Sequence, residues 1–589
     1  DDPNDAHISI LLETGNKILS EMDRNRCREL LMGAEIKLRN LDNHQATVLQ
    51  SDDDSHNADS ELDFRERREI SARIDSLRVA LSPQKYVPVE ILAEIFVKSA
   101  QLFLHHDHKA SPWSLRSVCS RWRSVAIQES RLWCTGMIDD RWTSPTPESS
   151  LRFLQAFIAT TGPLSISVAL NAPSDALSQF LLPNSHRLTR LWLSFDTTGK
   201  MLAFFALPGC HFPILVDLVL EVSVRLENPD TPTVVCEINR RKVFATASQL
   251  RKLTLIAFFG DEVWDTFLQL QFPWAQLTHL DIKVWKSTHK KALQILSQCR
   301  DLQSLKCMVD PVTLAGLVEL KSSLFLPHLR SFETFGLMCP QDSILNHELP
   351  WHELINLDIT IRAYFSSEML YTLIRRCPRL ETLRAFVPPR GPAKIPEIKI
   401  TLPFLHTLDL CLLRDPWLVE LLDAPSLLTL KVLHAQIALV TARLLAMITR
   451  LGHACQVRTL EIRTENEKEG FRTDTAMGDL LSAVPHVSKF VCTGSIIGTD
   501  SLQAIGVGSL LPRMEVLECM VDSPGAYLDM IEAQLAAKGN LIVGKAMVLD
   551  RPRNFDNVEE TLQGINNEQG TRFAIQSVSS RFDVRNTQS

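Results

Sequence analysis

One short segment of the chain gathers residue types that could bind a metal ion, His105–His106–Asp107–His108. Imidazole and carboxylate groups are common ligands of transition metals. Side chains of adjacent residues rarely converge on one ion, however, and no further candidate ligand stands at a supporting spacing. We therefore expect no metal site here and no cofactor.

A second segment, Gly506–Val507–Gly508, contains part of the pattern of a phosphate-binding turn. It lacks the third glycine of a dinucleotide-binding turn and the Lys-Ser/Thr pair of a phosphate-binding loop. The chain also lacks H-E-x-x-H, G-x-S-x-G and protein-kinase signatures. These patterns predict a protein that is not an enzyme, has no small-molecule substrate and acts by binding.

Composition narrows the class of protein further. A chain of 589 residues is too long for one compact core, so we expect several domains or a repeat array. A net charge of −7 argues against nucleic-acid binding. The chain contains no run of about 18 consecutive apolar residues, so we predict no membrane span. The 13 cysteines lack C-x-x-C spacing, which favours free thiols in a reducing compartment, cytoplasmic or nuclear.

The pattern L-x-x-L-x-L recurs from about residue 150, with a period near 26 residues. Such a period matches leucine-rich repeats. The clearest copies begin at Leu188, Leu215, Leu250, Leu277, Leu302, Leu354, Leu405, Leu427 and Val457, and weaker copies begin at Leu329, Leu380, Val487 and Met514.

The last two apolar residues of each motif are two apart, so a strand points both to one side. Helix-like stretches such as 292–296, 369–374 and 444–448 lie between motifs. One strand and one helix cannot bury their own apolar face, but stacked copies share a core. We therefore predict an α/β fold over residues 150–549, a leucine-rich-repeat solenoid with strands on the concave face. The polar segment 550–589 lacks the period and is expected to be a poorly ordered tail.

The N-terminal segment 1–81 is helical in character, with an acidic linker near 51–60. In its second half Ile70, Ile74, Leu77 and Leu81 form one stripe of a helix. The two helices could form an antiparallel hairpin or part of a coiled coil. A solvated helical lead-in is the alternative.

Residues 82–135 form a distinct helical module. Pro88 and Glu90 suit the first turn of a helix, where a missing N–H costs nothing and a carboxylate complements the dipole. The apolar face of this helix contains Ile91, Leu92, Ile95 and Phe96. A second helix is expected to begin at Ser111–Pro112, with an apolar face of Leu115, Val118, Cys119, Trp122 and Ala126, and Leu132–Trp133 closes the segment.

The block S-P-x-x-x-V-P-V-E-I-L-A-E-I-F resembles the start of the F-box-like domain of mushroom-type fungi. The run L-R-S-V-C-S-R-W-R-S-V-A before Leu132–Trp133 resembles its second half, so the resemblance covers about 50 residues. Val87 and Val89 stand where the family has Leu and Pro, and the stretch 102–111 looks like an insertion. Segments 297–305 and 375–383 resemble the cysteine-containing subclass of ribonuclease-inhibitor-like repeats.

This resemblance implies an adaptor that docks on a Skp-family protein and so joins a cullin–RING ubiquitin ligase, while its repeats hold a substrate protein. The adaptor would supply proximity, not chemistry. The implied contacts are Val87, Pro88, Ile91, Leu92 and Ile95, then Val118, Cys119, Trp122, Leu132 and Trp133. Any of them could instead pack the small helical core. The alternative function is a leucine-rich-repeat binding scaffold without a ligase, in which the module caps the solenoid.

The residue between the last two apolar positions of each motif should point out of the concave face. These residues are Trp192, Val219, Thr254, Asp281, Lys306, Glu333, Asp358, Arg384, Asp409, Lys431, Glu461, Val491 and Glu518. The row leans acidic, which predicts a substrate with a basic or mixed surface. A solvated polar face without specific partner is the alternative. Trp192 is either a binding hot spot or a sign of a capping repeat.

Overall fold

The computed structural model divides the chain into two compact units. The first contains residues 1–138 and 145–168, and we call it the helical unit; the second contains residues 139–144 and 169–589, and we call it the repeat unit. The structure describes residues 19–48, 57–82, 86–103, 115, 118–138, 147–171, 173–207, 211–223, 243–244, 246–257, 267–268, 270–284, 294–309, 325–335, 349–359, 367–387, 398–412, 417–433, 437–452, 456–463, 474–537, 540–549, 555–569 and 571–578.

The helical unit begins with an antiparallel hairpin of α2 (Glu21–Val48) and α3 (Asn57–Leu81). Three ion pairs join the two helices, namely Arg78 with Glu35 at 2.8 Å, Lys37 with Glu66 at 2.5 Å and Arg67 with Asp42 at 3.1 Å. Glu35, the earliest of these residues on α2, pairs with the latest on α3, Arg78, while Lys37 and Asp42 pair with the earlier Glu66 and Arg67, so the helices run in opposite directions. Of the alternatives that the sequence leaves open, the hairpin is the one present.

The predicted apolar stripe of α3 faces α2. Ile70, Ile74 and Leu77 are buried, and Leu77 packs with Cys27 and Leu19 at the open end of the hairpin. Tyr86 follows the hairpin and donates a hydrogen bond to the carbonyl of Ala80 at 3.2 Å. The guanidinium of Arg24 lies 4.6 Å from the ring centre of Tyr86. These contacts fix the end of α3 to the segment that follows it.

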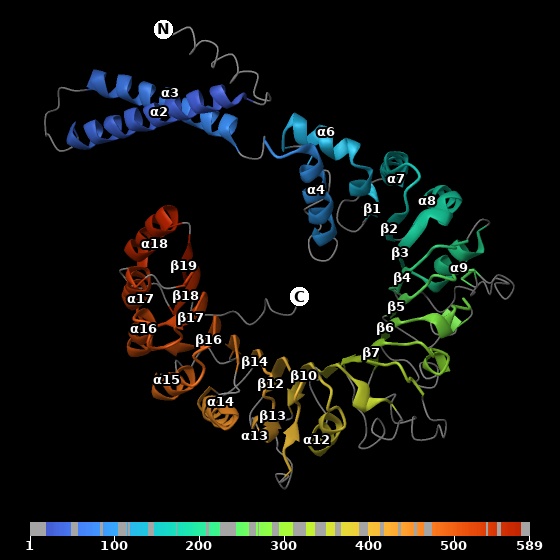
Figure 1. Cartoon of the computed structure of the whole chain (residues 1–589). Coiled ribbons are helices and arrows are strands. Elements are labelled where there is room, and N and C mark those ends of the chain that lie inside the picture. The colour runs from blue at the N-terminus through green and yellow to red at the C-terminus, as the bar shows by residue number, and fades with distance from the viewer. Residues whose placement is uncertain are drawn as a thin grey trace, which may run out of the picture. The chain divides into compact units, whose positions relative to one another are not determined.

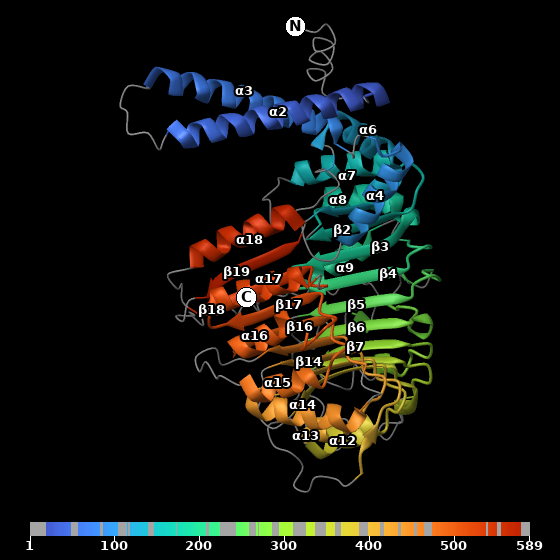
Figure 2. The ribbon, with the colours of Figure 1, turned by 60° about the vertical axis from the view of Figure 1, so that its left-hand side comes forward.

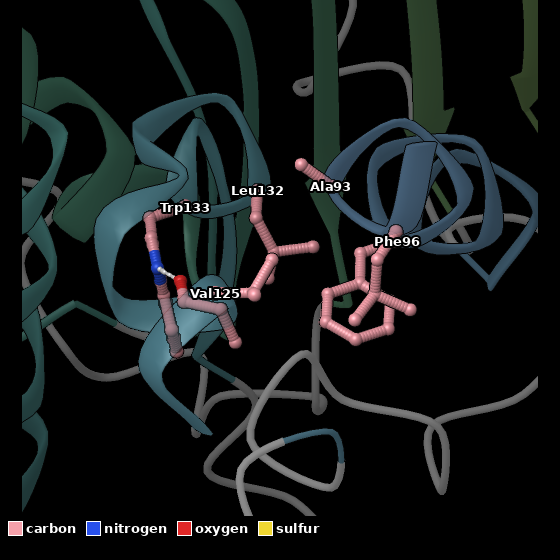
Figure 3. Packing of buried hydrophobic residues seen from close by; sticks show 7 residues of the cluster. Ala93, Phe96, Val125, Leu132 and Trp133 are labelled. Carbon is pink, nitrogen blue, oxygen red and sulfur yellow. Dashed lines mark hydrogen bonds between the residues drawn. The ribbon is translucent and has the colours of Figure 1, made fainter. Parts of the chain in front are cut away.

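Next comes a small helical module of α4 (Val89–Phe103), α6 (Ser120–Gln128) and the 3₁₀ helix η2 (Ser130–Trp133). Its core is formed by Leu92, Ala93, Phe96, Val125, Ala126, Leu132 and Trp133 (Figure 3). The expected helix start at Ser111–Pro112 lies outside the described residues. The helical unit also contains β1 (Thr135–Ile138) and α7 (Pro147–Thr161), so it extends beyond the predicted boundary at residue 135.

The repeat unit is a mixed α/β structure with one long parallel sheet (Figures 1 and 2). Each of its strands pairs with the next in chain order. They are β3 (Leu188–Phe195), β4 (Asp217–Val222), β5 (Lys252–Ala257), β6 (His279–Val284), β7 (Ser304–Val309), β8 (Ser331–Phe335), β9 (Asn356–Ile359), β10 (Thr382–Val387), β12 (Thr407–Leu412), β14 (Thr429–Leu433), β15 (Thr459–Arg463), β16 (Lys489–Ile497), β17 (Val516–Val521), β18 (Val543–Leu549) and β19 (Arg572–Val578). β2 (Ile166–Asn171) spans the boundary between the two units, and β11 (Ile400–Thr401) pairs with β13 (Leu422–Asp423) in a separate small sheet.

Every predicted motif from Leu188 to Met514 leads into one of these strands. The register places buried residues of one motif beside buried residues of the next, as when Leu408 of β12 pairs with Leu383 of β10 and with Leu430 of β14. The buried leucines of each strand are therefore flanked by buried residues of the two neighbouring strands. The prediction of stacked strands that share one core is confirmed for this sheet.

Helices and short 3₁₀ turns connect the strands on one side of the sheet. Figure 1 shows α14 to α18 on one face of the sheet formed by β14 to β19. The helices are α8 (Asp175–Leu181), α9 (Thr198–Ala206), α12 (Ser367–Arg375), α13 (Trp417–Leu421), α14 (Ile437–Leu451), α15 (Asp474–Ser482), α16 (Thr499–Gly506), α17 (Pro524–Ala536) and α18 (Phe555–Gln569), and the 3₁₀ turns are η3 (Leu182–Arg187), η5 (Trp274–Gln276) and η7 (Trp351–Glu353). The opposite face holds the residues between the two buried positions of each strand, and we call it the open face.

Two cysteines occupy equivalent places before their strands. The Cys299 thiol donates to the carbonyl of Ile295 at 3.3 Å, and the Cys377 thiol donates to the carbonyl of Leu373 at 3.2 Å. Burial raises the pKa of both thiols to about 12, so neither is a thiolate at neutral pH. Both cysteines act as small core residues with a weak donor.

The expectation of a poorly ordered tail over 550–589 is wrong for residues 555–578, which form α18 and β19. Phe573 and Ile575 are the buried pair of β19, and Asn566 exchanges two hydrogen bonds with the Phe573 backbone, at 2.6 and 2.7 Å. The segment escaped detection because it retains this pair but lacks the leading apolar residue of the motif. Residues 579–589 lie outside the described residues.

The preceding strand, β18, departs from the motif for a visible reason. Gly544 stands at the position that pairs with Leu517 and Phe573. A Cβ atom there would lie 2.5 Å from the Tyr527 hydroxyl and 2.9 Å from the Phe573 ring. Large neighbouring side chains therefore fill the space that a leucine occupies in other repeats.

We predict that Gly544→Ala lowers the free energy of unfolding by about 1–3 kcal/mol, because the added methyl group overpacks this part of the core. Urea denaturation measures the change. Gly564→Ala is the matched control, since a Cβ at Gly564 of α18 meets nothing within 4 Å. Alanine within a helix should be neutral or stabilising there. Equal effects of the two substitutions would contradict the packing argument.

Candidate binding surfaces

The residues that the sequence assigns to adaptor contact fall into two structural groups. Leu92, Leu132 and Trp133 are buried in the core of the small helical module, and Val87 and Trp122 are half-buried against it. The Trp122 ring packs on Phe96 with centroids 4.8 Å apart, and Trp133 Nε1 donates to the carbonyl of Ala126 at 2.6 Å. These five residues support the fold of the module and present little surface to a partner.

The second group is exposed. Ile91 is 53% exposed and Ile95 is 47% exposed, one turn apart on α4, and Val118 before α6 is 59% exposed. Pro88 is exposed at the start of the same helix. The module also exposes Val89 and Ile127, which sequence reasoning did not single out. Large apolar side chains that remain in water outside the core of a module are typical of an interaction surface.

Polar contacts hold the parts of this module together. Cys119 caps α6, since the Trp122 amide donates to its sulfur at 3.4 Å, so this predicted contact residue has a structural role. Arg121 donates to the carbonyl of Val87, which ties the start of α4 to α6. Arg131 bonds to Glu94 at 3.1 Å and to Glu129 at 2.8 Å, and the two carboxylates raise the pKa of Arg131. The apolar residues of α4 are thus held on a defined frame.

On the repeat unit, the register brings the predicted outward residues into one row. Trp192 pairs with Val219, Asp281 with Lys306, and Glu333 with Asp358, and the series continues along the open face. We call this series the central row. It extends two strands beyond the prediction, through Lys545 of β18 and Ala574 of β19. A search for the L-x-x-L-x-L motif misses both positions, because β18 has the leading Leu541 but Gly544 in place of the next leucine, and β19 lacks the leading apolar residue.

Charged residues of the central row pair with one another across strands. Arg384 bridges two strands, with Nε donating to Asp409 at 2.9 Å and Nη1 to Asp358 at 3.0 Å. Lys306 bonds to Glu333 at 2.6 Å. Charges of opposite sign on adjacent strands stabilise a sheet.

Glu461 has two cationic partners. Its carboxylate lies 3.3 Å from Lys431 in the same row and 2.5 Å from Arg463, two residues along β15. Burial opposes ionisation of Glu461, but Arg463 and Lys431 more than offset it, so the pKa of Glu461 is lowered. Asp281 is the contrasting case, because burial outweighs Lys283, its partner at 3.2 Å, and raises the pKa of Asp281.

The sequence predicted an excess of acidic residues on the open face, but the charge balance of this face in the structure is different. Residues two before and two after the central row point to the same side. These flanking positions add the cations Arg190, Lys252, Lys283, Arg463, Lys489 and Arg572, against the carboxylates Asp217 and Glu221. Among the described residues of the three rows, cations outnumber carboxylates. Sequence reasoning considered the central row alone and so missed the flanking cations.

Some predicted outward residues are covered. Asp409 and Glu461 are buried beneath their arginine and lysine partners, and Val491 of β16 is also buried. Trp192 is half-buried on β3, where Arg190 pairs with Asp217 of β4 at 3.1 Å. Asp281, Glu333 and Asp358 are half-buried, and Arg384 is exposed. A partner at this face would therefore meet the cationic head groups before the carboxylates.

Two sequence segments contain residue types of a metal site and of a phosphate-binding turn, and only the second lies within the described residues. His105–His108 lies outside the described residues. Gly506 is buried at the end of α16, where a Cβ would lie 3.2 Å from the Cβ of Ala533 on α17, so this glycine allows two helices to pack closely. Within the described ranges no group of three or more His, Cys, Asp or Glu side chains could hold a metal ion.

None of the helices in the described part of the chain is both long and apolar enough to cross a membrane. The cysteines in the described part form no disulfide bond.

Comparison with known proteins adds little. No protein-family model matches the chain, and no curated protein matches it. Among solved structures, the chain is similar to the crystal structure of the Rad7 and Elc1 complex in yeast, at 12% identity and a TM-score of 0.30, over 77% of this chain and 92% of that chain.

We predict that Glu461→Gln lowers the free energy of unfolding at neutral pH by about 1.5–3 kcal/mol, because it removes a buried carboxylate that bonds to two cations. The lowered pKa means that this contribution is present above the ordinary value of 4.5 and is lost as pH falls through the folded pKa. The difference between wild type and variant in urea denaturation should therefore shrink in acid.

Glu333→Gln provides the comparison, since Glu333 has one lysine partner and is less buried. Its effect should stay below about 1 kcal/mol. A Glu461→Gln effect that is independent of pH would contradict the assigned role of the carboxylate charge.

Proposed function

We propose that this protein is the substrate-recognition subunit of a Skp–cullin–F-box ubiquitin ligase. In this proposal the small helical module is an F-box-like domain that docks on a Skp-family adaptor. The repeat unit is a ribonuclease-inhibitor-like leucine-rich-repeat solenoid whose open face binds the substrate protein. The observation that carries the proposal is the exposure of Ile91, Ile95 and Val118, which lie outside the buried core cluster of the described part of the module.

The free energy that these exposed apolar side chains would gain by leaving water supports a docking role. Each large aliphatic side chain that leaves water on binding contributes about 1.5–3 kcal/mol. On α4, Leu92 and Phe96 point into the core while Ile91 and Ile95 stay in solvent. A helix that needed only its own fold would place polar residues on that second face. The sequence motif that resembles an F-box start covers the same helix.

The repeat unit supports the second half of the proposal. Its parallel strands bring one row of mostly charged side chains to a continuous face, as substrate-binding repeat proteins require. The protein would do no chemistry itself. It would raise the local concentration of substrate lysines near a charged conjugating enzyme in the cytoplasm or nucleus.

The test is co-purification of the full chain with a purified Skp-family adaptor. We expect Ile91→Asp combined with Ile95→Asp to weaken adaptor binding at least tenfold, because two charges would be buried against an apolar partner surface. Circular dichroism should show unchanged helix content, since neither residue contributes to the core. Leu92 is unsuitable for this test because it is buried, and its substitution would unfold the module.

Val507→Asp is the matched control. Val507 is 70% exposed on the turn after α16 in the repeat unit, so the substitution adds a charge at an exposed apolar site outside the module. Adaptor binding that survives the α4 double substitution, or an intact chain that fails to bind the adaptor, would support the alternative of a repeat scaffold without a ligase.

A further inference from the structure

We infer that the open face of the repeat unit binds an extended, carboxylate-rich segment of the partner protein, seated on Lys431 and Arg463 above the buried carboxylate of Glu461. This inference deepens the proposed function by naming the class of segment that the repeats hold. It replaces the partner with a basic or mixed surface that the central row alone predicts.

Exposure of the paired groups is the first support. The Arg384 side chain is 50% exposed, whereas its partners Asp358 and Asp409 are 16% and 11% exposed. Lys431 is 37% and Arg463 is 53% exposed, above a Glu461 side chain that is 7% exposed. The carboxylates form a lower layer and the cations an upper one. A basic partner could reach the carboxylates only by breaking these pairs.

Local charge is the second support. The Asp358–Arg384–Asp409 group has a surplus negative charge, but Lys431 and Arg463 share a single carboxylate and leave a surplus positive charge. Lys489 of β16 is exposed in the flanking row beside β15 and adds a third cation to this area. The strands β14, β15 and β16 therefore form the part of the open face that is suited to anions.

Geometry is the third support. Nε and Nη2 of Arg463 are committed to Glu461, which holds the guanidinium in place. A guanidinium has five N–H donors, so others remain for a ligand. Neighbouring strands are about 4.8 Å apart, and alternate side chains of an extended peptide are separated by roughly 6.5–7 Å. Flexible lysine and arginine side chains span that difference, so acidic residues two apart can meet cations on neighbouring strands.

The surroundings favour a peptide over a small anion. Thr429 and Thr459 lie half-buried in the flanking row of the same strands. On the other side, Leu433 of β14 pairs with Arg463 and with Cys411 of β12. Leu433 and Cys411 are half-buried. Hydroxyl, cationic and apolar groups thus neighbour one another on this part of the open face, which suits a segment with acidic and apolar side chains.

The experiment measures fluorescence anisotropy of the full chain at low salt with two labelled twelve-residue peptides. One repeats glutamate, serine, glutamate and leucine, so that its acidic side chains are two residues apart and lie on one side of the extended chain, and the other has lysine in place of glutamate. We expect the glutamate peptide to bind more tightly. Lys431→Ala combined with Arg463→Ala should weaken its binding at least tenfold, while urea denaturation shows that the variant remains folded.

Lys252→Ala combined with Arg572→Ala is the control, because it removes the same charge from exposed positions of the same face, on β5 and β19. It should change binding less than twofold. Tighter binding of the lysine peptide, or equal weakening by both double variants, would overturn the inference.

A measurement of adaptor binding distinguishes a failure of this inference from a failure of the proposed function. The Lys431 and Arg463 variant should bind the Skp-family adaptor as wild type does, because its changes lie in the repeat unit. Loss of the glutamate peptide with retained adaptor binding supports both proposals. An intact chain that binds the peptide but not the adaptor would contradict only the ligase assignment.

Discussion

The repeat unit depends on one constraint, which is that no turn of the chain can bury its own apolar pair. Leu383 and Ala385 of β10 leave water only because β9 and β12 pair with that strand in matching register. A shift by one residue would turn the apolar pair out and the charged residue in. The burial of the pair therefore fixes the register, and the register decides which side chains become neighbours on the open face.

The charge pattern of the open face is a consequence of that register. Arg384 reaches Asp358 and Asp409 because the three residues occupy the same place on adjacent strands. Lysine and arginine side chains are longer than those of aspartate and glutamate, so they extend above the carboxylates that they pair with. Glu461 is held ionised by two such neighbours, and its lowered pKa expresses that arrangement. The same ladder that stabilises the sheet thus presents cations to a partner.

In the small helical module, apolar residues form both a buried core and an exposed surface. Its helix α4 divides its apolar residues between two faces, and only the face with Leu92 and Phe96 is used for the core. Trp133 closes that core and satisfies its indole N–H on the Ala126 carbonyl. Ile91 and Ile95 lie outside this core and are exposed. The module and the open face of the repeats thereby offer one apolar and one charged surface.

The strands of the long sheet from β3 to β17 were predictable from the sequence, because a leading apolar residue and a buried pair two residues apart recur where each of them forms. The stripe of Ile70, Ile74 and Leu77 also predicted the second helix of the N-terminal segment, α3. The sequence did not decide the antiparallel pairing of α2 and α3, which rests on ion pairs such as Arg78 with Glu35. The order at residues 555–578 was missed because β19 keeps the buried pair Phe573 and Ile575 but lacks the leading apolar residue, and β18 was missed because Gly544 stands where the motif has leucine, with Tyr527 and Phe573 filling its space.

Only the tertiary structure decided which apolar residues of α4 are core and which are surface, since both faces look alike in a helical pattern. It alone showed that Asp409 and Glu461 lie beneath cations, because their partners Arg384 and Lys431 come from neighbouring strands. Periodicity reports which side of an element a residue occupies. The partner across a strand or a helix depends on contacts between residues far apart in the chain, and these arise only in the fold.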